Sequence, residues 1–180
     1  MTVIVENGTG LATANSYQSV ADVSAWLTLY SANGASNAFT AADTALQEPA
    51  VINATRFLDV EFVLAFKGVR KLGTQALQYP REGVVTNDGY AIDNDTLPAC
   101  LLAAHAELSL RFVADSTGHE TSRLLPDEAS PTGAIKRKRI KADVVEIDTE
   151  YVAAGRRKLY SIAVAHLAPI IHAGNRVVLA

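Results

Sequence analysis

Residues 95–114, DTLPACLLAAHAELSLRFVA, narrow the possible folds more than any other stretch of the chain. Their apolar positions recur at the three- and four-residue spacing of a helix with one buried face. Asp95 can cap this helix, and Pro98 fits its first turn. The buried face is predicted to contain Leu101, Ala104, His105, Leu108 and Phe112. This pattern favours a mainly α fold.

A second helix is predicted at about residues 20–32. Ser19 and Asp22 stand three apart, which is the spacing of a capping box with aspartate in place of glutamate. Asn33 and Gly34 stop the helix. Its apolar face is expected to contain Val20, Val23, Trp26, Leu27 and Tyr30.

A third amphipathic segment carries a proline inside its pattern. Thr40 and Asp43 can cap it, and its apolar stripe contains Leu46, Val51, Ala54, Leu58 and Phe62. Pro49 removes a backbone donor and clashes with the preceding turn, which costs roughly 3 kcal/mol inside a helix. We therefore expect a break or a kink at Pro49, with the stripe continuing beyond it.

The remaining segments complete one predicted domain, residues 1–180. Residues 67–97 read as a long ordered loop, and residues 115–133 as a polar connection. A last short helix is expected within residues 159–174. The predicted fold is a small bundle of about four helices with a projecting two-strand β arm at about residues 134–151 and extended termini, including a tail at about residues 174–180.

The predicted arm, AIKRKRIKADVVEIDTEY, places a cationic strand before an acidic one. Alternation puts cations on both faces of the first half, so it does not read as a half-buried core strand. A basic run is a common mark of nucleic-acid binding, yet the whole chain has a formal net charge of −3. The cationic half is expected to meet acids, either those of its own chain or those of a neighbouring subunit. A tight hairpin is possible, but the junction lacks an Asn-Gly turn signal.

The sequence lacks the residue patterns of common catalytic, cofactor and metal sites. ENGTGLAT is not a phosphate-binding P-loop, and there is no Gly-x-Ser-x-Gly elbow. The four histidines are scattered and read as satisfied or solvated side chains. We therefore expect no catalytic residues, no cofactor, no metal and no enzyme activity.

Further expectations concern the compartment. Cys100 is the only cysteine, so no intramolecular disulfide can form, and it reads as a small buried hydrophobe. No signal peptide and no membrane span are expected, and the pattern is typical of a protein made in a reducing compartment.

Three stretches resemble, in order, a family of tailed-phage head–tail connector proteins. They are GTGLATANSYQSVADVSAWL, then FKGVR with TQALQYPREGV, then DGYAIDNDTLPACLLAAHAELSLR. A basic strand before an acidic one and a C-terminal helix follow in that family. Some relatives carry a label of DnaT-like single-stranded-DNA binding. Pro49 interrupts a helix that is continuous in relatives, and Tyr79 stands where tryptophan is frequent.

The resemblance implies a structural virion protein and no enzyme. Such an adaptor forms a homo-oligomeric ring, usually of twelve copies, between the portal protein and a downstream tail or head-completion protein. Genomic DNA passes through the ring without specific contact, and no membrane is involved. The protein would be made in the cytoplasm of a bacterial host and would lie in the neck of the virion.

The resemblance also suggests two contact regions. The tail is expected to reach the portal by adding a strand, and disorder of this chain end is the less favoured alternative. Its residues are Arg176, Val177, Val178, Leu179 and Ala180. A subunit interface is expected at Lys136, Arg137, Lys138, Arg139, Lys141, Glu146, Asp148, Glu150, Tyr79 and Arg81. For the loop containing Tyr79 and Arg81, a simple cover for the core is an equal alternative.

The alternative function is a single-stranded-DNA-binding module of a phage or prophage. In that interpretation the cations from Lys136 to Lys141 bind phosphates. Such modules normally add aromatic rings on which bases stack. The nearest aromatic residues in the sequence are Tyr151 and Tyr160, so the sequence offers little for stacking.

Overall fold

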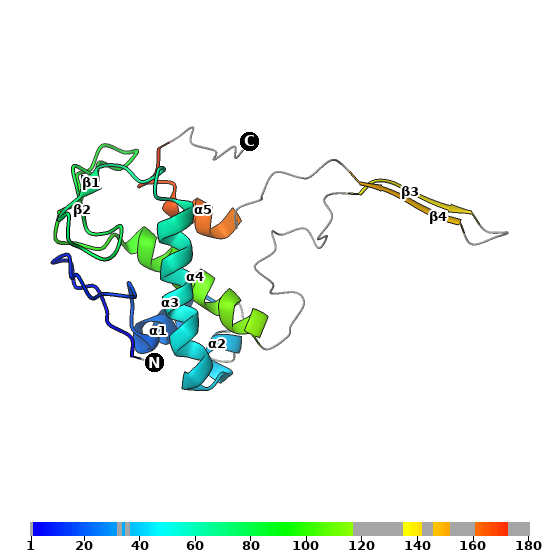
Figure 1. Ribbon diagram of the computed structural model, residues 1–180, viewed down its shortest axis with the longest axis horizontal. Coiled ribbons are helices and arrows are strands. Elements are labelled where there is room, and N and C mark those ends of the chain that lie inside the picture. The colour runs from blue at the N-terminus through cyan, green and yellow to red at the C-terminus, as the bar shows by residue number, and fades with distance from the viewer. Residues whose placement is uncertain are drawn as a thin grey trace.

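The computed structural model describes residues 2–31, 34, 37–116, 135–141, 146–151 and 161–172 (Figure 1). Its helices are α1 (Val20–Tyr30), α2 (Ala38–Ala41), α3 (Thr44–Glu61), α4 (Ala99–Ser116) and α5 (Ser161–Leu167). Two short strands, β1 (Val69–Arg70) and β2 (Arg81–Glu82), pair in one antiparallel sheet, and β3 (Ile135–Lys141) and β4 (Glu146–Tyr151) pair in another. The fold is mainly helical with a two-strand arm, as the sequence predicted.

Helix α1 begins at the predicted capping box. The Ser19 hydroxyl accepts the backbone N–H of Asp22, and the Asp22 carboxylate accepts the backbone N–H of Ser19. Val23 and Leu27 are buried, as expected. Tyr30 departs from the prediction, because its side chain is 67% exposed. The prediction was wrong there because the neighbouring elements cover α1 only up to Leu27.

Helix α3 runs without a break through Pro49, so of the predicted break or kink the break is wrong. Pro49 is the sixth residue of the helix, and only the carbonyl of Ala45 loses its usual donor. Asp43 occupies the N-cap position but makes no side-chain cap bond. The short helix α2, which the sequence did not predict, is capped by Asn37, whose side chain accepts the N–H of Thr40.

Helix α4 is central, because α1, α2, α3 and α5 all contact it. Its first carbonyl acceptor is Pro98, which accepts the N–H groups of Leu101 and Leu102. Asp95 instead lies in the preceding loop, where its backbone carbonyl closely approaches Gly8. Gly8 has a φ of 93°, and a Cβ there would overlap that carbonyl oxygen, so this approach requires glycine.

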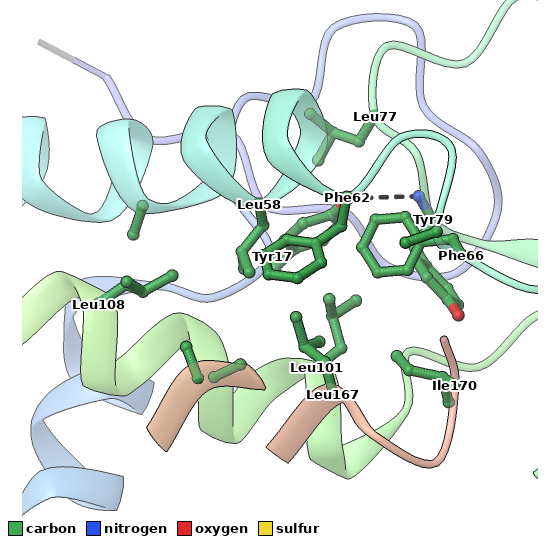
Figure 2. Close-up of a cluster of buried hydrophobic side chains, with 14 of the residues drawn as sticks. Tyr17, Leu58, Phe62, Phe66, Leu77, Tyr79, Leu101, Leu108, Leu167 and Ile170 are labelled. Carbon is green, nitrogen blue, oxygen red and sulfur yellow. Dashed lines mark hydrogen bonds between the residues drawn. The ribbon is translucent and has the colours of Figure 1, made fainter. Parts of the chain in front are cut away.

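The main core lies between α3 and α4 (Figure 2). Side chains from three other segments also belong to this core. They are Tyr17 from the N-terminal segment, Leu77 and Tyr79 from the long loop, and Leu167 of α5 with Ile170 just beyond it. The Phe66 and Tyr79 rings meet edge to face at 5.2 Å. A second core cluster joins α1, α2, α3 and α4 through Val23, Leu27, Phe39, Val51, Ala106 and Val113.

The loop of residues 67–97 is ordered by its own contacts, as predicted. Lys67 Nζ donates to the backbone carbonyls of Val85 and Pro169 and to Asn87 Oδ1. Asn87 in turn donates to the carbonyl of Ala168. These bonds fasten the loop to the segment that follows α5.

Candidate nucleic-acid and subunit interface

Strands β3 and β4 set basic positions opposite acidic ones. The antiparallel register pairs Arg137 with Glu150, Arg139 with Asp148, and Lys141 with Glu146. Opposite charges at paired positions of an antiparallel sheet are favourable, whereas like charges are not. The register therefore places the cationic and acidic halves opposite each other within one chain. Contact between their side chains stays a prediction.

Two cations of the arm have no acidic residue at the paired position. Lys138 is opposite Thr149, and Lys136 falls at a register irregularity between Ile135 and Arg137. Ile140 is paired with Ile147. The register thus divides the basic run into three charge-matched positions and two unmatched ones.

Arg81 and Tyr79 are buried in this fold. Arg81 is 7% exposed, and its guanidinium donates to the carbonyls of Lys67 at 2.8 Å and Gly68 at 2.7 Å. Its Cζ also lies 5.8 Å from the centre of the Phe66 ring. Burial lowers the pKa of Arg81, while the neighbouring Tyr79 opposes that shift. The structure thus favours the alternative that this loop covers the core, and a subunit contact through these two residues stays a prediction.

The loop is also held by a buried cluster around Asp59, which sequence reasoning missed. The Tyr17 hydroxyl donates to Asp59 Oδ1, and the backbone N–H of Gln78 donates to Asp59 Oδ2 at 3.1 Å. The N–H of Tyr79 donates to the Tyr17 hydroxyl at 3.3 Å (Figure 2). Burial raises the pKa of Asp59 to about 6, and its hydrogen bonds oppose the shift. Nothing in the local sequence marks Asp59, because its partners lie 19 and 42 positions away.

A shallow depression of about 340 Å³ lies beside this cluster. Its lining combines apolar side chains with four polar ones, Asn15, Thr55, Arg56 and Asp59. Both Asp59 oxygens already accept hydrogen bonds from within the chain. Asp59 therefore holds the loop in place, and the depression alone does not indicate a ligand.

His105 is a satisfied core histidine, as predicted. Its Nδ1 lies 3.0 Å from Gln18 Oε1, and its Nε2 lies 3.0 Å from Thr55 Oγ1 and 2.9 Å from the Val51 carbonyl oxygen. Burial lowers its pKa to about 4. His105 thus joins α4 to α3 and to the segment before α1 as a neutral ring.

The N-terminal glycine turn is closed by Glu6, a residue that the sequence did not single out. The buried Glu6 carboxylate accepts the backbone N–H groups of Gly8, Gly10 and Leu11 at 2.8–3.0 Å. A turn whose N–H groups already bind a carboxylate has no donors left for phosphate. The rejection of a phosphate-binding loop at this position therefore has a structural reason.

Some other residues of the sequence can be placed in the structure. Asn15 fixes the N-terminal segment by accepting the N–H of Ile4 and donating to the carbonyl of Thr2. Cys100 is half-buried, and burial raises its pKa. The part of the chain that the structure describes holds no cluster of three or more metal-ligand residues and no helix long and apolar enough to cross a membrane. The predicted portal-binding residues 176–180 lie outside the described residues.

One protein-family model, described as "Putative DnaT-like ssDNA binding protein", matches residues 1–179. No curated protein and no solved structure matches the chain. The model corresponds to the DnaT-like part of the resemblance seen in the sequence. The connector part of that resemblance stays a prediction.

Proposed function

Because the chain belongs to the family of DnaT-like single-stranded-DNA-binding proteins, we propose that it binds single-stranded DNA without sequence preference, mainly through the last third of the chain. The family assignment over nearly the whole chain is the observation that carries this proposal. The distribution of charge then indicates which part of the chain makes the contact.

Charge is divided unevenly along the chain. Residues 1–116 contain six Lys or Arg and twelve Asp or Glu, a net charge of −6, whereas residues 117–180 contain ten and seven, a net charge of +3. Neutralisation of phosphates is the largest general contribution to binding of nucleic acids. The acidic helical part repels a polyanion, so we assign the phosphate contacts to residues 117–180.

Within the arm, the register selects the cations that can bind phosphate. Arg137, Arg139 and Lys141 are paired with acidic positions, and an oligonucleotide would have to compete with those acids. Lys136 and Lys138 have no such competitor. We therefore assign phosphate binding in the arm to Lys136 and Lys138.

The test is a titration of fluorescently labelled dT30 by anisotropy between about 50 and 200 mM salt, with a duplex of equal length as comparison. The wild-type protein should prefer dT30, and its affinity should fall steeply with salt. Lys136→Gln with Lys138→Gln should lower the salt slope by about 1.4, since each phosphate contact with a single strand contributes about 0.7. Absence of dT30 binding at low salt would overturn the proposed function.

The matched control is Arg137→Gln with Arg139→Gln. It changes the net charge by the same amount but removes cations that the register already pairs with acids. We expect a smaller loss of affinity than in the lysine variant. Equal losses would show that only total charge matters and would refute the assignment to Lys136 and Lys138.

A second candidate function is the ring-forming head–tail adaptor, and the edges of the arm favour it. In the described part of the chain, the sheet of β3 and β4 has two strands, one rich in cations and one rich in acids, and each has a free edge. An acidic edge on one copy fits the basic edge of the next, and such head-to-tail contacts close into rings when the rotation permits.

The adaptor proposal predicts assembly that depends on charge. Sedimentation of the full chain, alone and with a portal protein, should show a ring that dissociates in high salt. Glu146→Lys with Asp148→Lys should abolish it, because β4 would then repel the basic edge of a neighbour. A wild-type protein that stays monomeric even with the portal would exclude this function.

A further inference from the structure

Two aromatic rings on the last turns of α1 meet a histidine of α5. Trp26 and Tyr30 are four residues apart and share one face of the helix, with their ring centres 4.9 Å apart. The His166 ring lies 6.1 Å from Trp26, edge to face. We call Trp26, Tyr30 and His166 the ring cluster. The fold creates it, because α1 and α5 both pack on α4 (Figure 1).

The ring cluster is open to solvent on the Tyr30 side. Tyr30 is 67% exposed and the adjacent Leu29 is 75% exposed, while Trp26 and His166 are half-buried. On α5, Ile162 lies one turn before His166 and is 38% exposed. A planar ring supported from behind by another ring, with little else covering it, is suited to stack on a flat partner.

The two segments that carry the ring cluster contain few acidic residues in the sequence. No Asp or Glu occurs between Asp22 and Asp43. Asp22 lies in the first turn of α1, eight residues before Tyr30, which is about 12 Å along a helix. In the sequence, Arg156-Arg157-Lys158 ends two residues before α5, and no acid occurs after Glu150. These two segments therefore add little negative charge that would repel a polyanion.

We propose that the ring cluster is a base-stacking site for single-stranded nucleic acid, with Tyr30 as the exposed ring. This inference rests on the proposed function. It supplies the aromatic rings for base stacking that the basic segments lack. Proteins that bind single strands combine cations for the phosphates with aromatic rings for the bases. The cations of residues 117–180 provide the first, and the ring cluster provides the second. The Tyr30 ring binds any base, since every base offers a π face.

The experiment uses the single tryptophan as its reporter. Trp26 is the only tryptophan of the chain, so quenching of intrinsic fluorescence reports directly on the ring cluster. The full-length protein is titrated with dT20 and with an abasic 20-mer that carries the same phosphates but no bases. We expect quenching by dT20 and little by the abasic strand. Tyr30→Ala should weaken dT20 binding, measured by anisotropy, about five- to hundredfold and leave abasic binding unchanged.

Two variants control the interpretation. Tyr30→Phe keeps the ring and should bind dT20 within about twofold of the wild type, as should Leu29→Ala, which removes a neighbouring exposed side chain. All three substitutions change exposed positions, so thermal melting should stay close to that of the wild type.

The outcomes separate this inference from the proposed function. If dT20 binds with unchanged Trp26 emission and Tyr30→Ala retains full affinity, the stacking site is overturned and single-strand binding stands. If the wild-type protein does not bind dT20, both fail. If Tyr30→Ala changes the sedimentation mass and leaves dT20 binding intact, the surface binds a second copy, and the inference is wrong.

Discussion

Charged residues are arranged differently in the helical part and in the β arm. In the helical part, Glu6 and Arg81 are buried and bind backbone groups, so each charge holds a turn or a loop in place. In the arm, cations and acids occupy paired positions of two strands. Charge in the first region serves structure within the chain, whereas the cations of the second are the ones to which we assign phosphate binding. The comparison implies that stability and phosphate binding reside in different regions and respond to different substitutions.

The largest expected effect tests whether stability resides in the helical part. Leu58→Ala removes a fully buried side chain from the core between α3 and α4 and should lower the free energy of unfolding by about 3 kcal/mol. Leu29→Ala, at a position 75% exposed, should change it by less than about 0.5 kcal/mol. Urea denaturation followed by circular dichroism measures both. Similar values for the two variants would show that the buried cluster is not the stabilising core.

The next effect concerns binding. Replacement of Arg156, Arg157 and Lys158 by glutamine removes three cations after the last acid of the chain, so dT30 affinity should fall roughly ten- to hundredfold at low salt. Replacement of Arg137, Arg139 and Lys141 removes three cations that face acidic positions and should cost less. Anisotropy measures both. The reverse order would mean that the paired acids do not compete with DNA.

The smallest effect lies inside the helical part and depends on pH. The folded-state pKa of Asp59 is raised to about 6, so its contribution to stability is present at low pH and is lost as the pH rises through about 6. The folded-state pKa of His105 is lowered to about 4, so its contribution is present above about 6.5 and is lost as the pH falls. Between pH 6 and pH 5 the two effects oppose each other, each by about 1 kcal/mol.

Two variants separate these contributions. Relative to the wild-type curve, Asp59→Asn should lose about 1 kcal/mol of unfolding free energy from pH 6 to pH 5, because only His105 still titrates in a buried site. His105→Gln should gain a similar amount. Denaturant titrations at pH 6 and pH 5 measure the free energy of unfolding of each protein. If it changed with pH by the same amount in all three proteins, the opposed pKa shifts of Asp59 and His105 would be contradicted.

Local patterns predicted much of the secondary structure. The capping box of Ser19 and Asp22, the face of α4 and the two strands of the arm depend on spacings within a few residues, and the structure contains all three. Pro49 was misjudged because the local rule gives the cost of a proline but not the packing of Val51, Ala54 and Leu58 that compensates for it. The sequence did not predict that Tyr79 and Arg81 of the proposed subunit interface are buried, because their burial depends on residues far away in the sequence.

The sequence by itself determined a mainly helical chain with a charged two-strand arm, because apolar periodicity, caps and strand alternation act over one or two turns. Only the tertiary structure decided which charged residues are buried and which cations of the arm lie opposite acidic positions. The partners of His105 include Gln18, 87 positions away, and the register sets Arg139 opposite Asp148. It also brought Trp26 and His166 together from opposite ends of the chain. The contacts of His105, Trp26 and His166 arise from packing around α4, and no local pattern encodes them.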